Sequence, residues 1–512
     1  FWTTKRAPAH NSRLCLPCLV IWRLFSFSTS IYHLAFLSLN QFLSTARCKR
    51  KNVAMVDVAH AFSEDLNATQ QPLQSGGDSD VAADVQLDDV KQCSATRPSA
   101  NGSRKAKKRS LWSYLHKEVR RGYQLEEQRY EKRRAKFYAF FRIPRELERF
   151  VLYGFLQCAD AFLSVLTLLP VRFALAAGLL GARLVGRRRL QPAESCDLLK
   201  GLVLLGTWLL AAQVDTSMLY HIVKSQSVIK LYIFFNMLEV ADKLFSSFGQ
   251  DILDALLWTA TEPEPRRARR RLGLLAHLML ALAYVFLHCL LVMLQATTLS
   301  VAINSQNKAL LTIMMSNNFV ELKGMVFKKF AKNNLFQMAC SDIRERFHYV
   351  VLLLVVIVQT MREYSWHQER FWSLLWDCLL VLLAEMLVDW VKHAFVTRFN
   401  AISWQVYREY LTSLAYDLAS TKLHTAPSDH GDLVSRRLGF TPLPLAAMVL
   451  RVMAWPPWSV RLALLTYVCL CSFKVLLNLV LLSRACSLVE QHRQTLLEDS
   501  PEKQSHRPKF PE

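Results

Sequence analysis

The segment FWSLLWDCLLVLLAEMLVDWVKHAF, residues 371–395, decides the fold class of this chain. It is rich in Leu, Val, Trp and Phe, and it is long enough to cross a bilayer, because about 20 helical residues span a hydrocarbon core of about 30 Å. Further apolar runs occur at Phe150–Leu169, Val171–Val185, Leu198–Met218, Leu272–Ile303, Phe347–Met361, Leu443–Trp455 and Val460–Leu482. The pattern predicts an all-α, multi-pass integral membrane helical bundle of about six to eight spans.

The composition of the 512 residues supports this class. Hydrophobic residues make up 52% of the chain and charged residues 20%, while Gly and Pro are sparse, so collagen-like and wholly disordered chains are excluded. A soluble globular protein is disfavoured, because the apolar residues occur in long runs that are separated by basic blocks. The formal net charge at neutral pH is +22.

The chain divides into five segments by composition. The first 54 residues are interpreted as a leader or as upstream translation, with Met55 as the expected start. Residues 55–103 hold eight acidic side chains and few apolar ones, which predicts a disordered polar tail. A basic juxtamembrane helical region follows at 104–149, the transmembrane domain at 150–483 and a polar C-terminal tail at 484–512.

The basic region at 104–149 contains sixteen Lys and Arg side chains interleaved with aromatic residues. Directly before a membrane span, such a region suits the anionic cytosolic leaflet, at about 1 kcal/mol for each basic residue near the surface. A solvated helix without a ligand is the simplest alternative. Nucleic-acid binding is a further rival, but no RRM, KH or zinc-finger pattern accompanies the basic residues. Membrane lipids are therefore an expected partner, and nucleic acid is not.

The orientation of the spans depends on Pro170. If Phe150–Val185 is a hairpin broken at this proline, most basic loops lie in the cytosol, as the positive-inside rule requires. If Phe150–Val185 instead crosses the membrane once, the orientation of the later spans is reversed, and most of these basic loops lie in the lumen. We therefore expect the hairpin, although it leaves the basic segment Arg266–Arg271 on the lumenal side.

Residues 227–263 show the periodicity of amphipathic helices. Apolar side chains form one stripe between Val228 and Leu244, and charged side chains lie opposite it. Gly249 is placed to end that helix, and Gln250–Trp258 can form a second one. We expect amphipathic interfacial helices here, arranged as a hairpin on the membrane surface or against the bundle.

Sequence signatures of catalysis are absent. There is no GxSxG nucleophile elbow, HExxH zinc helix, P-loop or GxGxxG after a strand. Cys15 and Cys18 have CxxC spacing without a second ligand pair. His277 and His288 stand about 16 Å apart along a helix, too far to share one metal ion. We therefore expect no enzyme activity and no catalytic, metal or cofactor site, with structural roles for the two histidines.

The most informative ionisable residues lie within the opening segment. Asp377, Glu385, Asp389, Lys392 and His393 interrupt its apolar sequence. Glu385, Asp389 and His393 share one helix face at spacing i, i+4 and i+8. A charge at mid-bilayer costs about 2.5–3.5 kcal/mol, so these groups should face protein or water. Three uses stay open: local pairing of Asp389 with Lys392 and His393, a polar seam for a partner helix, and a proton or ion pathway.

The segment at 300–347 contains a candidate partner-docking surface. Met314, Met315 and Phe319 would form an adaptable apolar surface with basic flanks. Packing within the core is the alternative use of these side chains. If they are exposed, a protein partner is the expected occupant.

Several of these segments resemble the Tapt family, the homologues of transmembrane anterior posterior transformation proteins. The resemblance covers about Leu111–Arg484 and includes RIPRELERF (142–150), the segments 227–263 and 300–347, VDWVKHAF (388–395) and RRLGFTPLPLA (436–446). It implies a non-enzymatic, multi-pass protein of the endoplasmic reticulum membrane, a scaffold or adaptor that supports folding or trafficking of secretory-pathway proteins.

The resemblance also implies links, in animals, to primary cilium formation and skeletal patterning. The base of the primary cilium is therefore a second expected location, and proteins of the endoplasmic reticulum membrane or lumen are expected partners. The family offers no catalytic or cofactor-binding residues to transfer to this chain. A transporter or channel that uses the charged stripe between Asp377 and His393 is the alternative function.

Overall fold

The computed structural model describes residues 127–184, 191–261, 267–305, 322–424, 431–453 and 460–499, together with a few single positions. The chain divides after Phe137 into two compact units, and every contact described below lies within the unit that contains Tyr138–Glu512. The expected leader at 1–54 and the expected polar tail at 55–103 lie outside the described residues.

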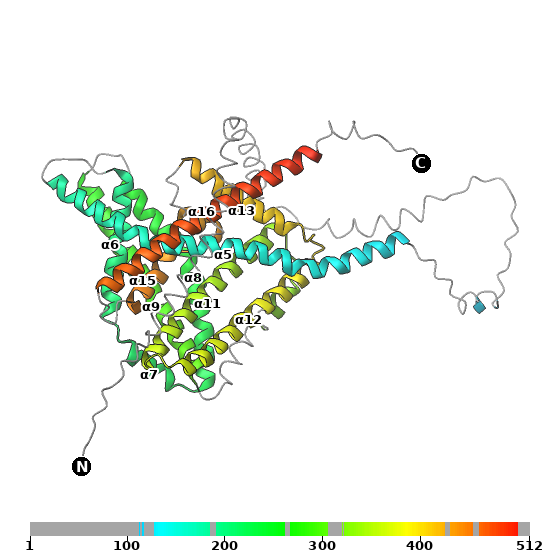
Figure 1. Ribbon diagram of the computed structural model, residues 1–512, viewed down its shortest axis with the longest axis horizontal. Coiled ribbons are helices and arrows are strands. Elements are labelled where there is room, and N and C mark those ends of the chain that lie inside the picture. The colour runs from blue at the N-terminus through cyan, green and yellow to red at the C-terminus, as the bar shows by residue number, and fades with distance from the viewer. Residues whose placement is uncertain are drawn as a thin grey trace, which may run out of the picture. The chain divides into compact units, whose positions relative to one another are not determined.

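Every regular element in these ranges is an α-helix, which confirms the all-α prediction (Figure 1). The helices are α5 (Glu127–Leu184), α6 (Pro192–Ala212), α7 (Thr216–Lys224), α8 (Val228–Thr261), α9 (Arg267–Asn304), α11 (Lys332–Glu363), α12 (Gln368–Phe399), α13 (Val406–His424), α14 (Gly431–Leu438), α15 (Pro442–Met453) and α16 (Val460–Asp499).

Five of the described helices are long and apolar enough to cross a membrane. The candidate spans are Phe137–Gly181 in α5, Pro192–Ala212 in α6, Leu272–Asn304 in α9, Gln368–Phe399 in α12 and Arg461–Leu496 in α16. The count is five rather than six to eight for two reasons. The predicted runs on either side of Pro170 form one helix, and the runs in α11 and α15 are too short.

Pro170 does not divide α5, which continues through it as one helix, so the predicted hairpin is wrong. A proline inside a helix leaves a carbonyl group of the preceding turn without its usual donor, and a neighbouring helix can supply another. Pro170 leaves the Leu166 carbonyl without its helical donor. The neighbouring Thr167 carbonyl oxygen, in the same turn, accepts a hydrogen bond of 2.6 Å from the Tyr467 hydroxyl of α16. Farther along, Lys474 and Asp160 form a buried ion pair at 2.7 Å. Helix α16 thus lies antiparallel beside α5 (Figure 1).

Gly249 does not end a helix either, because α8 continues through it, so the predicted break into two helices at 227–263 is wrong. The expected alternative, packing against the bundle, is observed. A Cβ atom at Gly249 would overlap the Tyr284 hydroxyl of α9 and lie 3.0 Å from Cγ2 of Thr441. The glycine therefore permits a close helix contact. Helix α8 packs antiparallel along α9, where the Tyr284 hydroxyl donates to the Phe245 carbonyl at 3.0 Å.

Helix α9 forms the centre of the described bundle. Helices α6, α7, α8, α11, α12 and α15 all contact it. Ala281, Val285 and Cys289 recur every four residues along α9 and are fully buried. Around this centre, α13 packs against α16, and α14 packs against α11.

The outer face of α12 is apolar, whereas its inner face is charged. Trp376 is 70% exposed, and Leu380 and Leu383 are about half exposed. Asp389 and Lys392 on the same helix are only 2–3% exposed. This distribution reverses that of a water-soluble helix and is typical of a helix that faces lipid on one side and protein on the other.

We predict that Gly249→Leu destabilises the bundle, because the new side chain would displace Tyr284 from α8. Overpacking of a tight contact typically costs about 1–3 kcal/mol. Gly178→Leu is the matched control, since a Cβ atom at Gly178 meets nothing within 4 Å. Thermal unfolding of the detergent-solubilised protein measures both effects. Equal melting temperatures for the two variants would contradict the close-contact role of Gly249.

Candidate functional site

The strongest concentration of buried charge lies between α11 and α12. Asp342 and Arg346 are one turn apart on α11, and Asp389, Lys392 and His393 are spaced i, i+3 and i+4 on α12. Helical periodicity places each group on one face of its helix. The two faces meet, and the Asp342, Asp389, Lys392 and His393 side chains are at most 4% exposed.

Lys392 is the centre of this cluster. Its ammonium group lies 2.9 Å from Oδ1 of Asp389 and 2.7 Å from Oδ1 of Asp342. The second oxygen of Asp342 lies 2.6 Å from Nε2 of His393, and Nδ1 of His393 lies 2.8 Å from the Tyr407 hydroxyl of α13. Asp342 of α11 thus bridges two residues of α12, and His393 continues the contacts to α13.

Arg346 extends the cluster in the other direction. Its Nε donates to Oδ2 of Asp389 at 2.8 Å, and its Nη1 donates to Oε1 of Glu148 on α5 at 2.7 Å. The Trp390 indole also donates to Oε1 of Glu148, at 2.6 Å. The result is a continuous series of polar contacts from Glu148, which is 31% exposed, to the buried Tyr407. We call the series Glu148, Arg346, Asp389, Lys392, Asp342, His393 and Tyr407 the charged chain.

Acidic and basic side chains alternate along the charged chain. The carboxylates of Glu148, Asp342 and Asp389 contact Arg346, Lys392 and the His393 ring. Burial alone would raise the pKa of Asp342, but Lys392 and His393 outweigh it and hold this pKa below its usual range. Contacts between opposite charges of this kind reduce the cost of burying ionised groups.

The structure brings together three of the five predicted stripe residues. The expected local pair of Asp389 and Lys392 is present, whereas His393 contacts Asp342 rather than Asp389. Glu385 lies one turn before Asp389, and Asp377 lies about three turns before it. Both are half-buried on α12. The other predicted set, Met314, Met315 and Phe319, lies outside the described residues.

Sequence reasoning missed the partners that other helices supply. Asp342 and Arg346 precede the apolar part of α11 at helical spacing, which is a usable signal, but nothing local indicates what they contact. Glu148 belongs to RIPRELERF and Trp390 to VDWVKHAF, two of the motifs on which the family resemblance rests. Their hydrogen bond shows that these motifs meet in the fold.

A second polar cluster joins α8, α9 and α11. His288 is buried, with its Nε2 2.9 Å from Asp242 and its Nδ1 3.0 Å from the Tyr284 hydroxyl. His348 lies 3.0 Å from the side-chain oxygen of Gln295. His288 thus connects α8 to α9 through its contact with Asp242. The described residues contain no group of three or more His, Cys, Asp or Glu side chains arranged to hold a metal ion.

We predict that Lys392→Met strongly destabilises the protein, because it leaves two buried carboxylates without their shared cation. Breaking a buried ion pair costs about 3–5 kcal/mol. Arg493→Gln is the control: its ion pair with Glu490 is largely exposed, and such pairs contribute about 0–1 kcal/mol. The free energy of unfolding in detergent micelles is the measurement. A loss below about 1 kcal/mol for Lys392→Met would show that the charged chain does not stabilise the bundle.

Comparison with known proteins identifies relatives along most of the chain. A family model described as a eukaryotic membrane protein family matches residues 190–490. The Protein TAPT1 homolog of Drosophila melanogaster is 50% identical over 435 residues, which cover 80% of this chain and 64% of that protein. The human transmembrane anterior posterior transformation protein 1 homolog is 52% identical over 396 residues, 75% of this chain and 69% of the relative. No solved structure matches significantly.

A more distant relative matches a similar share of this chain. The Protein TAPT1 homolog of Dictyostelium discoideum is 38% identical over 422 residues, which cover 76% of this chain and half of the relative. The chain thus spans about two thirds of the fly and human proteins. The family model covers the candidate spans in α6, α9 and α12 and most of the span in α16, whereas the span in α5, Phe137–Gly181, lies before the matched residues. The chain belongs to this eukaryotic membrane protein family, the Tapt family of multi-pass transmembrane proteins.

Proposed function

We propose that this protein is a non-enzymatic scaffold or adaptor of the endoplasmic reticulum membrane that supports folding or trafficking of secretory-pathway proteins. The observation that carries the proposal is the charged chain. Its polar side chains join α5, α11 and α12 through contacts of 2.6–2.9 Å, and the Tyr407 hydroxyl extends these contacts to α13. Charges engaged in this way hold helices in a defined register, which a platform for other proteins requires.

The proposed location and biology rest on the family. Relatives in human, mouse and chicken carry the words transmembrane anterior posterior transformation in their names, which agrees with a role in skeletal patterning. The sequence resemblance supports residence in the endoplasmic reticulum membrane, with a link to the primary cilium and its base. The five candidate spans agree with a membrane location.

The proposed partner-docking surface is the segment between α9 and α11, with Met314, Met315 and Phe319. The two helices that flank this segment, which end at Asn304 and begin at Lys332, belong to the core of the bundle. Membrane lipids are the other proposed partner.

We predict that changing Met314, Met315 and Phe319 to Ser prevents the protein from restoring secretion in cells that lack it. The variant should still insert into the endoplasmic reticulum membrane, because the changed residues lie outside the five candidate spans. Pulse-chase secretion of glycoproteins measures the function, and microscopy with a lumenal marker measures the location. The control is Met218→Ser with Ile222→Ser, two exposed apolar residues of α7.

Two outcomes of this experiment would count against the proposals. Full rescue by the triple variant would show that these three residues do not form the docking surface. Normal secretion in cells without the protein would contradict the scaffold function itself.

A transporter or channel is a second candidate, favoured by the continuity of the charged chain. Asp342, His393 and Tyr407 contact one another in series and can exchange a proton, and Lys392 connects Asp342 to Asp389. This function predicts pH-dependent flux in proteoliposomes that Glu385→Gln together with Asp389→Asn abolishes, whereas Arg493→Gln does not. Proteoliposomes that show no flux above protein-free vesicles would exclude this candidate.

A further inference from the structure

Helix α8 has an apolar outer face to which the proposed function assigns no role. Six side chains, spaced three or four residues apart, form one stripe along the helix and are 51–71% exposed: Ile229, Ile233, Met237, Val240, Leu244 and Phe248. This outer stripe covers about 28 Å along the helix axis. Single apolar residues on a surface are ordinary, whereas a continuous apolar patch of this length indicates a contact surface.

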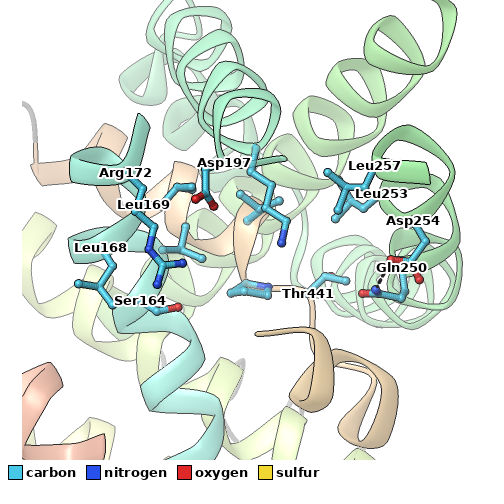
Figure 2. Close-up of a pocket in the computed structure, with 14 residues that line it drawn as sticks. Ser164, Leu168, Leu169, Arg172, Asp197, Gln250, Leu253, Asp254, Leu257 and Thr441 are labelled. Atoms are coloured by element: carbon cyan, nitrogen blue, oxygen red, sulfur yellow. Dashed lines mark hydrogen bonds between the residues drawn. The ribbon is translucent and has the colours of Figure 1, made fainter. Parts of the chain in front are cut away.

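The opposite face of α8 is buried in the bundle. Its buried apolar side chains also recur at helical spacing: Leu231, Phe235, Leu238, Leu253 and Leu256. Two polar residues farther along, Gln250 and Asp254, line a cavity that α8 shares with α5 and α6 (Figure 2). Gln250 donates to Oδ1 of Asp254 at 2.8 Å, so this pair is directed into the bundle and away from the outer stripe.

The charged residues near the middle of α8 have partners within the bundle. Asp242 lies 2.9 Å from His288 of α9, and Lys243 lies 3.2 Å from both Glu239 of α8 and Glu345 of α11. These charges explain why the composition of α8 does not mark it as a candidate span. Charges that pair with protein groups are nevertheless compatible with a membrane crossing, because they do not meet lipid alone.

The contact with α9 places α8 beside a candidate span. The Gln295 amide of α9 donates to the Leu238 carbonyl oxygen at 3.3 Å, and a Cβ atom at Gly273 of α9 would lie 3.9 Å from Cγ2 of Thr259. Both α9 residues belong to the span Leu272–Asn304. Between the two contacts α8 extends for about 32 Å. A helix that follows a membrane span over the thickness of the hydrocarbon core lies at the same depth as that span.

Exposed charges lie near the two ends of the outer stripe. Lys230 and Asp251 are both exposed, and about 32 Å of helix separates them. Between them, the exposed residues are apolar except for Ser247, whose hydroxyl donates to the Leu244 carbonyl oxygen at 2.7 Å. Because a hydrocarbon core is about 30 Å thick, the distance between the two exposed charges matches the thickness of the core.

We propose that α8 crosses the bilayer as a further span and that its outer stripe contacts the acyl chains of membrane lipids. Water is disfavoured as the occupant, because a helix on a water-exposed surface carries polar residues where this stripe is apolar. A protein partner would not require a stripe as long as the hydrocarbon core with a charge near each end. If α8 crosses, Ser227 and Glu262, which flank it in the sequence, lie on opposite sides of the membrane.

Chemical labelling from one side of the membrane tests the crossing. The reporters are Ser227→Cys and Glu262→Cys in the full chain, and the unsubstituted chain gives the background from native cysteines. In sealed microsomes, a membrane-impermeant maleimide should label only one of the two reporters, and permeabilisation with detergent should expose the other. Labelling of both reporters in sealed microsomes, or protection of both, would overturn the proposal.

Spin labels on the outer stripe test its contact with acyl chains. Met237→Cys and Leu244→Cys carry the label in vesicles of phosphatidylcholine. Oxygen, which concentrates in hydrocarbon, should relax both labels more strongly than a water-soluble nickel complex does. Leu380→Cys, on the outer face of α12, is the matched control in a candidate span, and Gln226→Cys, an exposed residue before α8, is the control for water.

The same measurement distinguishes lipid from the other occupants of the outer stripe. Stronger relaxation by nickel than by oxygen at Met237 and Leu244 would show that the stripe faces water. Protection of both labels from both agents would show that protein covers it, either a partner helix or a second copy of the chain. Each of these results would overturn the proposal. Neither assay measures secretion, so the crossing and the scaffold function can fail independently.

Discussion

The need to compensate buried charge determines how the described helices of this protein meet. In a bilayer, apolar side chains gain little by moving from lipid to a protein interface, so the hydrophobic effect alone does not select helix partners. Charged groups do select them, because each must find an opposite charge. Asp160 joins α5 to α16 through Lys474, Asp242 joins α8 to α9 through His288, and Asp342 joins α11 to α12 through Lys392. Each pair connects two different helices.

The same reasoning explains which parts of the fold could be predicted from the sequence. Membrane-spanning character is a local property of about 20 residues, so α6, α9, α12 and α16 could be recognised from their apolar runs. Local rules predict that Pro170 and Gly249 each break a helix, and both predictions are wrong. The partner of each lies on another helix: Tyr467 supplies a donor near Pro170, and Tyr284 occupies the space beside Gly249.

The same limit of prediction from local sequence applies to the charged chain. The contact between Asp389 and Lys392 spans one helical turn, and the sequence indicated it. His393 could have contacted Asp389 one turn away, but it contacts Asp342, which is 51 residues distant in sequence. The periodicity of α12 alone does not indicate the contact between His393 and Asp342. The family motifs that include Glu148 and Trp390 are separated by 242 residues, and only the fold shows that they form one site.

The charged chain also shows how so much charge can lie inside a bundle of apolar helices. The side chains of Asp342, Asp389, Lys392 and His393 are at most 4% exposed and contact one another at 2.6–2.9 Å. Each of the two buried carboxylates has two partners: Asp342 contacts Lys392 and His393, and Asp389 contacts Lys392 and Arg346. Arg346 and Glu148, which are 11% and 31% exposed, continue these contacts to α5. Because a buried charge that loses its partner is costly, these contacts favour one register of α11 against α12 and α5.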